Sequence, residues 1–327
     1  MNLSFSDIKN ITVGAVSITE SEDGIRFARC TEKQIATWAS ESDFLGNGAR
    51  ATTGIKLDLV TDSPFIEFSA SSGNRFEIHV DGMLRRVLFM NEYRERGEVA
   101  HVPVTDPFGR PFASGERHRV TLLLPCHEVG VINHVSVEDG ATVEPYQHST
   151  RILFIGDSIT QGWDSGYISM AYTQRVEDFF DAESINQGIG GSFFNADAFD
   201  NLNFDPDLTV VAYGTNDWGK RGSTEDLFNH AKAHLSLIKN AFGGGDTKIF
   251  AISPIWRDEP KPRAMGSFSD CRGAVIKAID EVGVIHIDGL SLVPPCPELF
   301  ADKNLHPNAL GFSFYSENLI GHILKHL

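Results

Sequence analysis

The hydrophobic period of this chain changes between residues 138 and 150, and this change constrains the fold more than any other feature. Before it, apolar residues alternate with polar ones at period two, which is typical of half-buried strands in antiparallel sheets. After it, short apolar runs alternate with segments at helical spacing, which indicates parallel strands joined by helices. The sequence of 327 residues therefore predicts two domains, 1–148 and 149–327.

The segment from about residue 10 to 140 predicts an antiparallel β-sandwich of the jelly-roll type. In one hairpin, Phe76, Ile78 and Val80 alternate with polar residues, and Asp81-Gly82 supplies the turn. We expect one face of this hairpin to be solvated. The expected strands are 56–60, 65–70, 76–80, 84–89, 119–124 and 131–137. No convincing helix pattern is found here, so we expect an all-β accessory domain, with a packing or positioning role favoured over carbohydrate binding.

The second half predicts a parallel five-stranded sheet with helices on both faces, which makes three layers. The expected strands are 152–155, 184–187, 208–213, 248–253 and 284–287. One helix has clear limits, because Ser223 and Asp226 form a capping-box pattern and Gly243 to Gly245 end the apolar period. A final helix is expected to begin near Asn308, with Phe314, Ile320 and Leu324 turned inward.

Composition excludes several classes of protein. The net charge of −16 argues against nucleic acid as a partner, since such binding depends on Lys and Arg. No apolar run is long enough to span a bilayer, and residues 1–20 lack the pattern of a signal peptide, so we expect no membrane association and a cytoplasmic location by default. The four cysteines lack metal-site spacing and are expected to be free thiols. Composition says nothing about the oligomeric state.

A serine lies directly after the first strand of the second half. The segment Gly156-Asp157-Ser158-Ile159-Thr160 follows the apolar run 152–155. A serine hydroxyl is a poor nucleophile unless a base takes its proton, and His306, in a Leu-His-Pro-Asn segment, is the candidate base. Ligands of such sheets bind at the carboxyl ends of the strands, where this serine is expected.

Two further segments follow predicted strands in the same way, namely 186–192, Asn-Gln-Gly-Ile-Gly-Gly-Ser, and 213–217, Tyr-Gly-Thr-Asn-Asp. With the serine and histidine segments they form four motifs in one order, and in this the second half resembles the SGNH (GDSL) hydrolase superfamily. The resemblance implies a flavodoxin-like hydrolase domain and a serine esterase activity without metal or organic cofactor.

The resemblance also implies an oxyanion hole, in which aimed hydrogen-bond donors meet the negative charge on the ester oxygen. Carried over by motif, the donors are the backbone N–H groups of Ser158 and Gly191 and the side-chain amide of Asn216. Gly191 is chosen from the spacing that starts at Asn186. The adjacent Gly190 stays open as the alternative donor.

The acid that would orient the histidine departs from the family pattern. The family has Asp three residues before His, whereas Lys303 stands there and the nearest carboxylate is Asp302, four residues before His306. Either a bulge brings Asp302 to the ring, which we favour, or a backbone carbonyl orients a Ser-His dyad. Asp157 is expected to be a structural hydrogen-bonding residue.

Aromatic and basic residues follow the strands of the site. Trp163, Trp218 and Trp256 are candidate platforms for a sugar ring or an acyl chain, or simply cover the end of the sheet. The loop from 256 to 268 carries Arg257 and Arg263 and is a candidate lid or substrate clamp.

The two-domain order narrows the resemblance to family 2 carbohydrate esterases, which remove acetyl groups from sugars. The expected activity is therefore hydrolysis of short acyl esters, acetyl esters in particular, of a carbohydrate or small alcohol through an acyl-enzyme intermediate. Two alternatives stay open: transfer of the acyl group to an alcohol other than water, and a lipase-like or thioesterase-like acylhydrolase. The expected partner is thus a small-molecule or carbohydrate ester.

Overall fold

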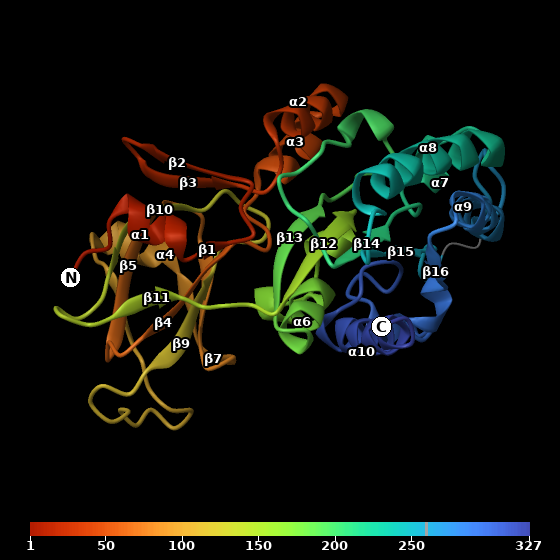
Figure 1. The fold of residues 1–327 in the computed structure, drawn as a ribbon. Coiled ribbons are helices and arrows are strands. Elements are labelled where there is room, and N and C mark those ends of the chain that lie inside the picture. Colours follow the sequence, from red (N-terminus) through yellow and green to blue (C-terminus); the bar gives the residue numbers. More distant parts are fainter. Residues whose placement is uncertain (259–260) are drawn as a thin grey trace. The chain divides into compact units, whose positions relative to one another are not determined.

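The computed structural model describes residues 1–258 and 261–327 (Figure 1). The chain divides into two compact units, of which the first comprises Met1–Cys30 and Arg50–His148 and the second Thr31–Ala49 and Ser149–Leu327. The sequence-based boundary falls at the same place, after His148. The difference is the segment 31–49, which the sequence assigned to the first domain and which groups with the second unit.

The first unit contains two antiparallel sheets. One has the strand order β1-β4-β9-β6-β7 with β11 paired to β4, and the other has the order β2-β3-β10-β5-β8. The strands of the first sheet are β1 (Thr12–Val13), β4 (Lys56–Thr61), β6 (Arg75–Val80), β7 (Met83–Phe89), β9 (His118–Leu123) and β11 (Val143–Pro145). Those of the second are β2 (Ser17–Ser21), β3 (Gly24–Ala28), β5 (Phe65–Ser72), β8 (Ala100–Pro103) and β10 (Val131–Ser136). All six expected strands are confirmed, and the unit is jelly-roll-like.

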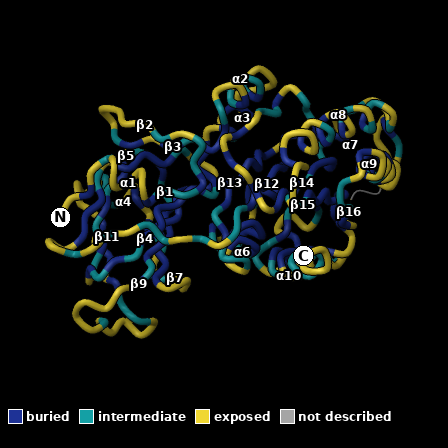
Figure 2. The backbone as a smooth tube through the Cα atoms, in the orientation of Figure 1, coloured by how far each residue is buried: buried dark blue, intermediate teal, exposed yellow. Residues whose placement is uncertain are grey.

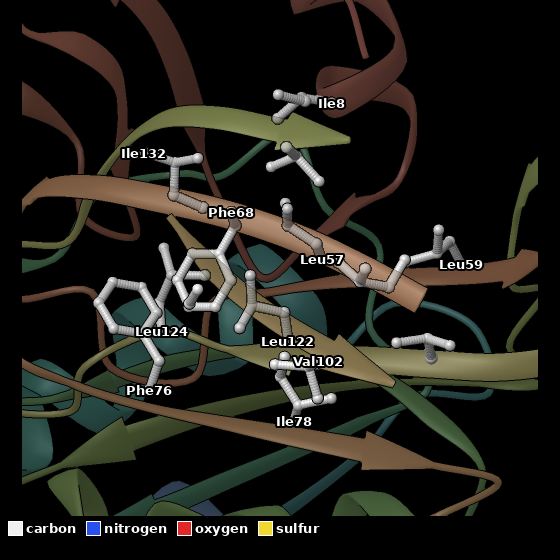
Figure 3. Close-up of a cluster of buried hydrophobic side chains, with 14 of the residues drawn as sticks. Ile8, Leu57, Leu59, Phe68, Phe76, Ile78, Val102, Leu122, Leu124 and Ile132 are labelled. Atoms are coloured by element: carbon white, nitrogen blue, oxygen red, sulfur yellow. The ribbon is translucent and has the colours of Figure 1, made fainter. Parts of the chain in front are cut away.

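Apolar residues of alternate strand positions form the core of the first unit (Figure 3). On β5, Ile66, Phe68 and Ala70 are buried and the residues between them are only partly buried. The ring of Phe68 lies 5.3 Å from that of Phe76 on β6. Burial of these side chains stabilises the unit, at about 25 cal/mol for each Å² of apolar surface removed from water.

The hairpin of β6 and β7 has the expected turn, because Asp81 and Gly82 both have positive φ, at 50° and 76°. The expected solvated face is wrong for β6, since Glu77 and His79 are buried, whereas most residues of β7 are exposed or partly buried. Several charged groups of this sheet are buried together with a partner of opposite charge. Asp58 on β4, for example, accepts hydrogen bonds from Arg119 at 2.7 and 2.9 Å. Pairing of this kind makes the burial of charge tolerable.

The second unit has a parallel sheet of five strands with the order β13-β12-β14-β15-β16, as predicted (Figure 1). The strands are β12 (Thr150–Gly156), β13 (Ala182–Gly188), β14 (Leu208–Ala212), β15 (Lys248–Ile252) and β16 (Ile285–Ile287). β12 comes first of these five strands in the sequence, and it lies between β13 and β14, which is the flavodoxin-like order. Figure 2 shows the strands of this sheet largely buried.

Helices cover both faces of this sheet (Figure 1). α6 and α10 contact each other on one face, and α8 and α9 contact each other on the other. The helices of the second half are α5 (Ser158–Gln161), α6 (Tyr172–Phe179), α7 (Asp217–Lys220), α8 (Thr224–Phe242), α9 (Phe268–Val282) and α10 (Ala309–Leu324). Short 3-10 helices are η1 (Ile168–Met170), η2 (Ala196–Ala198), η3 (Gly289–Ser291) and η4 (Pro297–Leu299).

The helices α8 and α10 begin at the expected caps, but the buried face of α10 differs from the expected one. Ser223 caps α8 by accepting a hydrogen bond from the Asp226 N–H at 3.1 Å, and Asn308 caps α10. In α10 the inward face carries Phe312, Tyr315, Leu319 and Ile323, whereas two of the three residues expected inward, Phe314 and Leu324, are exposed. The helix is apolar on most sides, so its period alone does not select the buried face.

The absence of helices from the first half is a wrong prediction. The structure has α1 (Phe5–Asn10), α2 (Glu32–Glu41), α3 (Asp43–Arg50) and α4 (Met90–Arg96). A signal for α2 was present, since Thr31 and Gln34 form a capping box in the structure. The period-two pattern of the surrounding residues favoured strands and concealed this helix signal. Because α2 and nearly all of α3 belong to the second unit, this is also the segment where the domain assignment differs.

Candidate active site

The four motif segments of the second unit meet at the carboxyl edge of the parallel sheet. Ser158 begins α5 directly after β12, the loop with Gly191 follows β13, and Asn216 follows β14. His306 lies in the loop before α10. Strand β12 has β13 on one side and β14 on the other, so the chain connections run in opposite directions from it. Such a switch point is where parallel sheets bind ligands.

The turn that presents Ser158 requires glycine at position 156. A Cβ atom there would lie 2.1 Å from Oγ1 of Thr160, so only glycine fits. The side chain of Asp157 then caps α5, with Oδ1 accepting a hydrogen bond from the Ile159 N–H at 3.0 Å. Ser158 is thereby placed at the first position of a helix with its hydroxyl toward the edge of the sheet. Asp157 has the structural role that the sequence suggested.

The hydroxyl and imidazole groups predicted from the sequence are in contact. Oγ of Ser158 lies 2.9 Å from Nε2 of His306, although 148 positions separate the two residues. On the other side of the ring, Nδ1 lies 2.9 Å from Oδ2 of Asp302. Serine, histidine and carboxylate thus form a continuous chain of hydrogen bonds with the geometry of a catalytic triad.

The backbone between Asp302 and His306 explains how a carboxylate four residues away reaches the ring. Oδ1 of Asp302 accepts hydrogen bonds from the backbone N–H groups of Asn304, Leu305 and His306 at 2.9, 2.7 and 3.1 Å. Lys303 has a φ of 61°, in the left-handed region, which tightens the loop. Burial raises the pKa of Asp302, but these backbone hydrogen bonds outweigh it and hold the pKa below its usual value. The carboxylate is therefore charged where it faces His306.

A second carboxylate, Asp164, also lies near His306. Its Oδ2 is 3.7 Å from Nδ1 of His306, beyond hydrogen-bond distance but within reach of a charge interaction. Asp164 has a φ of 64° in the turn that follows α5. No sequence pattern points to Asp164, since neither its spacing nor its neighbours distinguish it.

The amide group of Asn216 is held in one orientation beside the serine loop. Its Nδ2 donates a hydrogen bond to the carbonyl oxygen of Ser192 at 2.8 Å, which leaves its second N–H for another acceptor. The choice between the two adjacent glycines is also clear. The N–H of Gly190 donates to Oε1 of Gln161 at 2.6 Å, whereas Gly191, with a φ of 80°, makes a turn that favours glycine. Gly191 is therefore the better candidate donor.

Asn186 and Gly188 fix the position of this loop against α5. Nδ2 of Asn186 donates to the carbonyl oxygen of Thr160 at 2.9 Å, and its Oδ1 accepts from the Gly188 N–H at 2.8 Å. A Cβ atom on Gly188 would lie 2.4 Å from the Gln161 nitrogen. The Asn-x-Gly pattern thus allows two backbones to approach closely, which positions the candidate donors.

Two buried carboxyl groups lie behind the site. Burial raises the pKa of Asp157 to about 7, partly opposed by the hydrogen bond from Ile159, and the charge of Asp217 raises it further. Burial also raises the pKa of Asp217 to about 6, although Arg221 acts in the opposite direction. The two groups therefore hold protons at a pH where exposed carboxyl groups are ionised.

The three tryptophans predicted as substrate platforms differ in exposure. Trp163 is partly buried, and its ring centroid lies 6.3 Å from that of His306. Trp218 is 1% exposed and its Nε1 donates to the carbonyl oxygen of Gly266 at 3.0 Å, so its ring offers no free face to a substrate. Trp256 packs against Phe300, with ring centroids 4.9 Å apart. Trp163 is thus the tryptophan that the structure brings to the serine.

The arginines of the expected lid or clamp stack on buried aromatic rings. Arg263 lies over the ring of Trp218 at 4.5 Å, and Arg257 lies over it at 5.3 Å. Arg257 also donates hydrogen bonds to Thr215 at 3.0 and 3.2 Å. These contacts give both side chains a structural explanation. Pro260, part of the same expected lid, lies outside the described residues.

Within residues 1–258 and 261–327 no group of three or more His, Cys, Asp or Glu side chains is placed to hold a metal ion. In the same part of the chain, no helix combines the length and the apolar character needed to cross a bilayer. The four cysteines are thiols, of which Cys30, Cys126 and Cys271 are buried and Cys296 is partly buried.

Comparison with known proteins agrees with this geometry. Residues 154–313, which include all four motif segments, match the model of the GDSL-like lipase/acylhydrolase family. No curated protein matches the chain significantly.

Several solved structures share the fold of both halves. A salicylyl-acyltransferase, SsfX3, from a tetracycline biosynthetic pathway is 20% identical, with a TM-score of 0.82 over 99% of this chain and 97% of that chain. A family 2 carbohydrate esterase from Cellvibrio japonicus is 14% identical, with a TM-score of 0.67 over 100% and 97%. Another from Clostridium thermocellum, in complex with cellohexaose, is 17% identical, with a TM-score of 0.63 over 85% and 94%. At these identities the likeness establishes the fold.

Proposed function

We propose that this chain, whose residues 154–313 match the GDSL-like lipase/acylhydrolase family, is a carboxylic ester hydrolase that cleaves short acyl esters of a carbohydrate or small alcohol, acetyl esters in particular. The observation that carries this proposal is the contact of 2.9 Å between Oγ of Ser158 and Nε2 of His306. A base at this distance activates a hydroxyl for attack on an ester carbonyl.

In the first half of the reaction Ser158 is acylated. Oγ attacks the carbonyl carbon while its proton passes to Nε2 of His306, and the carbonyl electron pair moves onto the oxygen. The N–H groups of Ser158 and Gly191 and the amide of Asn216 donate hydrogen bonds to this oxyanion. When the tetrahedral intermediate collapses, the bond to the alcohol oxygen breaks and His306 gives its proton to that oxygen.

In the second half water releases the acyl group. His306 takes a proton from the water as its oxygen attacks the acyl carbon, and the same donors bind the new oxyanion. The bond to Oγ of Ser158 then breaks, and the proton on His306 returns to Oγ. The carboxylic acid leaves and the free serine is restored.

Asp302 supports both halves by fixing the imidazole. Its carboxylate accepts a hydrogen bond from Nδ1, which keeps the ring proton on that nitrogen and leaves Nε2 free to accept the serine proton. Its negative charge also stabilises the imidazolium that forms in each half. We therefore favour a triad over the dyad that the unusual spacing left open.

The likeness to family 2 carbohydrate esterases supports an acetylated sugar as substrate, because it extends over the first unit as well as the second. Trp163 beside His306 supports a ring near the leaving group, since aromatic faces stack on sugar rings.

A second function, acyl transfer to an alcohol acceptor, has its own support. The salicylyl-acyltransferase is similar over nearly the full length of both chains. Transfer needs the same acyl-enzyme and differs in the nucleophile of the second half, so the residues of the triad do not separate the two functions.

A panel of esters tests the proposal. Wild type and Ser158→Ala are assayed with 4-nitrophenyl acetate, butyrate and octanoate and with an acetylated oligosaccharide, and Ser40→Ala on the exposed surface of α2 serves as the control. We expect a preference for acetyl that Ser158→Ala abolishes and Ser40→Ala keeps. Equal activity of Ser158→Ala and wild type would overturn the proposal.

The same assays with an added alcohol distinguish hydrolysis from transfer. Nitrophenol release counts the acyl-enzyme formed, and free acetate counts the part that reacts with water. Equal amounts of the two products in the presence of glycerol or a sugar indicate hydrolysis. A deficit of acetate matched by a new ester indicates transfer.

A further inference from the structure

The helix pair of α2 and α3 is anchored to the end of β13 and to the loop region that follows this strand. The side-chain amides of Gln34 and Gln187 form two hydrogen bonds with each other, both 3.0 Å, in a buried position. At the start of α2, Oγ1 of Thr31 donates to Asp200 at 2.6 Å. Buried polar groups that are satisfied in this way hold one arrangement, because breaking it leaves donors and acceptors without partners.

Apolar and close backbone contacts place the same helices against the candidate oxyanion loop. The ring of Trp38 in α2 packs edge-on against Phe193, with centroids 5.4 Å apart. A Cβ atom on Gly48 of α3 would lie 3.0 Å from Cγ2 of Ile189, so α3 touches the segment that leads to Gly191. The 31–49 segment therefore packs against the loop that carries Gly191.

Phe44, at the start of α3, lies beside the candidate donor glycine and is largely exposed. The residue has 56% of its surface accessible. Its Cε1 is 3.3 Å from the point where a Cβ atom of Gly191 would lie. Its ring centroid is 6.1 Å from that of Trp163 at an interplanar angle of 57°, and Trp163 in turn lies near His306.

Two aromatic rings therefore border the reacting serine, one next to Gly191 and one next to His306. An exposed phenylalanine gains free energy when a ligand covers it, and aromatic rings bind other rings better than they bind small groups. Acetate or ethanol is too small to cover either ring. The flat face of a sugar or an aromatic group is large enough.

We propose that Phe44 is a specificity-determining residue, and that a ring of the ester substrate, carried on its acyl group or on its alcohol, packs against Phe44 and Trp163. This inference rests on the proposed ester hydrolysis at Ser158 and names the class of substrate for that site. Phe44 belongs to the segment that the sequence assigned to the accessory domain, so the second unit takes part of its substrate wall from the first half of the chain.

Three small esters test the proposal, and for each ester the variants are compared with wild type so that the different reactivities of the esters cancel. Ethyl acetate has no ring, ethyl benzoate has one on the acyl side, and phenyl acetate has one on the alcohol side. Each is assayed by acid release with wild type, Phe44→Ala and Phe44→Leu. The control is Phe179→Ala, since Phe179 on α6 has nearly the same exposure, 55%.

We expect Phe44→Ala to lower kcat/KM about tenfold for at least one of the ring-bearing esters while ethyl acetate changes less than about twofold. The ester that responds identifies the side of the substrate that carries the ring. Phe44→Leu keeps apolar bulk without a flat face, so its kcat/KM for that ester is expected to lie between the values of wild type and Phe44→Ala. Equal changes for all three esters, or no change for any, would overturn the proposal.

A binding measurement separates this proposal from the proposed function. Ethyl benzoate and phenyl acetate are titrated by calorimetry into Ser158→Ala and into the Ser158→Ala, Phe44→Ala double variant. Weaker binding to the double variant supports ring contact and does not depend on Ser158 being the nucleophile. Equal binding to both variants argues against ring contact even where Ser158 proves to be the nucleophile.

Discussion

Replacement of Asp302 by asparagine keeps the shape of the side chain that contacts His306 and removes its charge. Oδ1 of Asp302 accepts three backbone hydrogen bonds, and the asparagine oxygen is expected to take this role because an amide nitrogen cannot accept them. Nδ2 then replaces Oδ2, which lies 2.9 Å from Nδ1 of His306. An N–H there donates to Nδ1, so the ring proton moves to Nε2, which can no longer accept the Ser158 proton.

The expected loss combines a charge effect and a tautomer effect. At an effective dielectric constant of about 20, a carboxylate about 4 Å from an imidazolium stabilises it by about 4 kcal/mol. The Asp302 side chain is 35% exposed, so we discount this for solvent screening to about 2–3 kcal/mol. That energy corresponds to about 100-fold in rate. With the wrong tautomer added, we expect Asp302→Asn to lower kcat/KM by about 100- to 1,000-fold.

Asp164 provides the internal control, because its carboxylate lies 3.7 Å from the same ring nitrogen. Asp164→Asn in wild type is expected to change kcat/KM by less than about threefold, since a carboxylate outside hydrogen-bond distance does not set the tautomer. In the Asp302→Asn background, Asp164→Asn is expected to lower kcat/KM by a larger factor than in wild type, because Asp164 is then the remaining carboxylate beside His306.

The assay is steady-state hydrolysis of 4-nitrophenyl acetate by the two single variants, the double variant and wild type, with thermal unfolding to check that each is folded. A loss of less than about fivefold in folded Asp302→Asn would refute the reasoning and favour a Ser-His dyad. An effect of Asp164→Asn as large as that of Asp302→Asn would reverse the roles assigned to the two carboxylates.

Two further predictions concern the surroundings of the serine. Asn216→Ala is expected to lower kcat about 100-fold with little change in KM, because the lost amide donor acts on the oxyanion; a rise in KM at unchanged kcat would contradict this role. For Asp157→Asn, the free energy of unfolding in urea minus that of wild type is expected to increase as the pH rises from about 5 to 8. The pKa of Asp157 is about 7 in the folded protein and about 3.9 when unfolded, so between these values folding takes up a proton and wild-type stability falls with rising pH. A difference between the variants that does not change with pH would refute this.

Local patterns determined the parts of the structure that depend on neighbouring residues. The strands of the parallel sheet and the helix α8 lie where apolar runs, caps and terminal glycines predicted them. The order of the motif segments also determined which side chains meet, because parallel strands place all their carboxyl ends at one edge of the sheet. For this reason the segments of Ser158, Gly191 and Asn216 could be placed at one edge of the sheet without coordinates, whereas His306, which follows no strand of the sheet directly, is assigned to the site by the resemblance of its motif.

Other features depend on a backbone conformation or on contacts between distant segments, and no local pattern encodes them. The contact between Asp302 and His306 requires the left-handed turn at Lys303, which a residue count does not reveal. The burial of Trp218 depends on the Gly266 segment that covers it. Asp164 is brought to His306 by a turn that has no distinctive spacing.

The sequence alone located the strands of the parallel sheet, the candidate nucleophile Ser158 and the motifs that carry the candidate donors, since each is written in a short stretch of chain beside a strand, and it located the candidate base His306 by its Leu-His-Pro-Asn motif. The tertiary structure alone decided the place of the 31–49 helices and of Phe44 beside Gly191. Their position rests on hydrogen bonds and packing with residues more than 140 positions away, such as the pairing of Gln34 with Gln187. Contacts at that separation are selected by the free energy of the whole folded unit, which a local pattern does not contain.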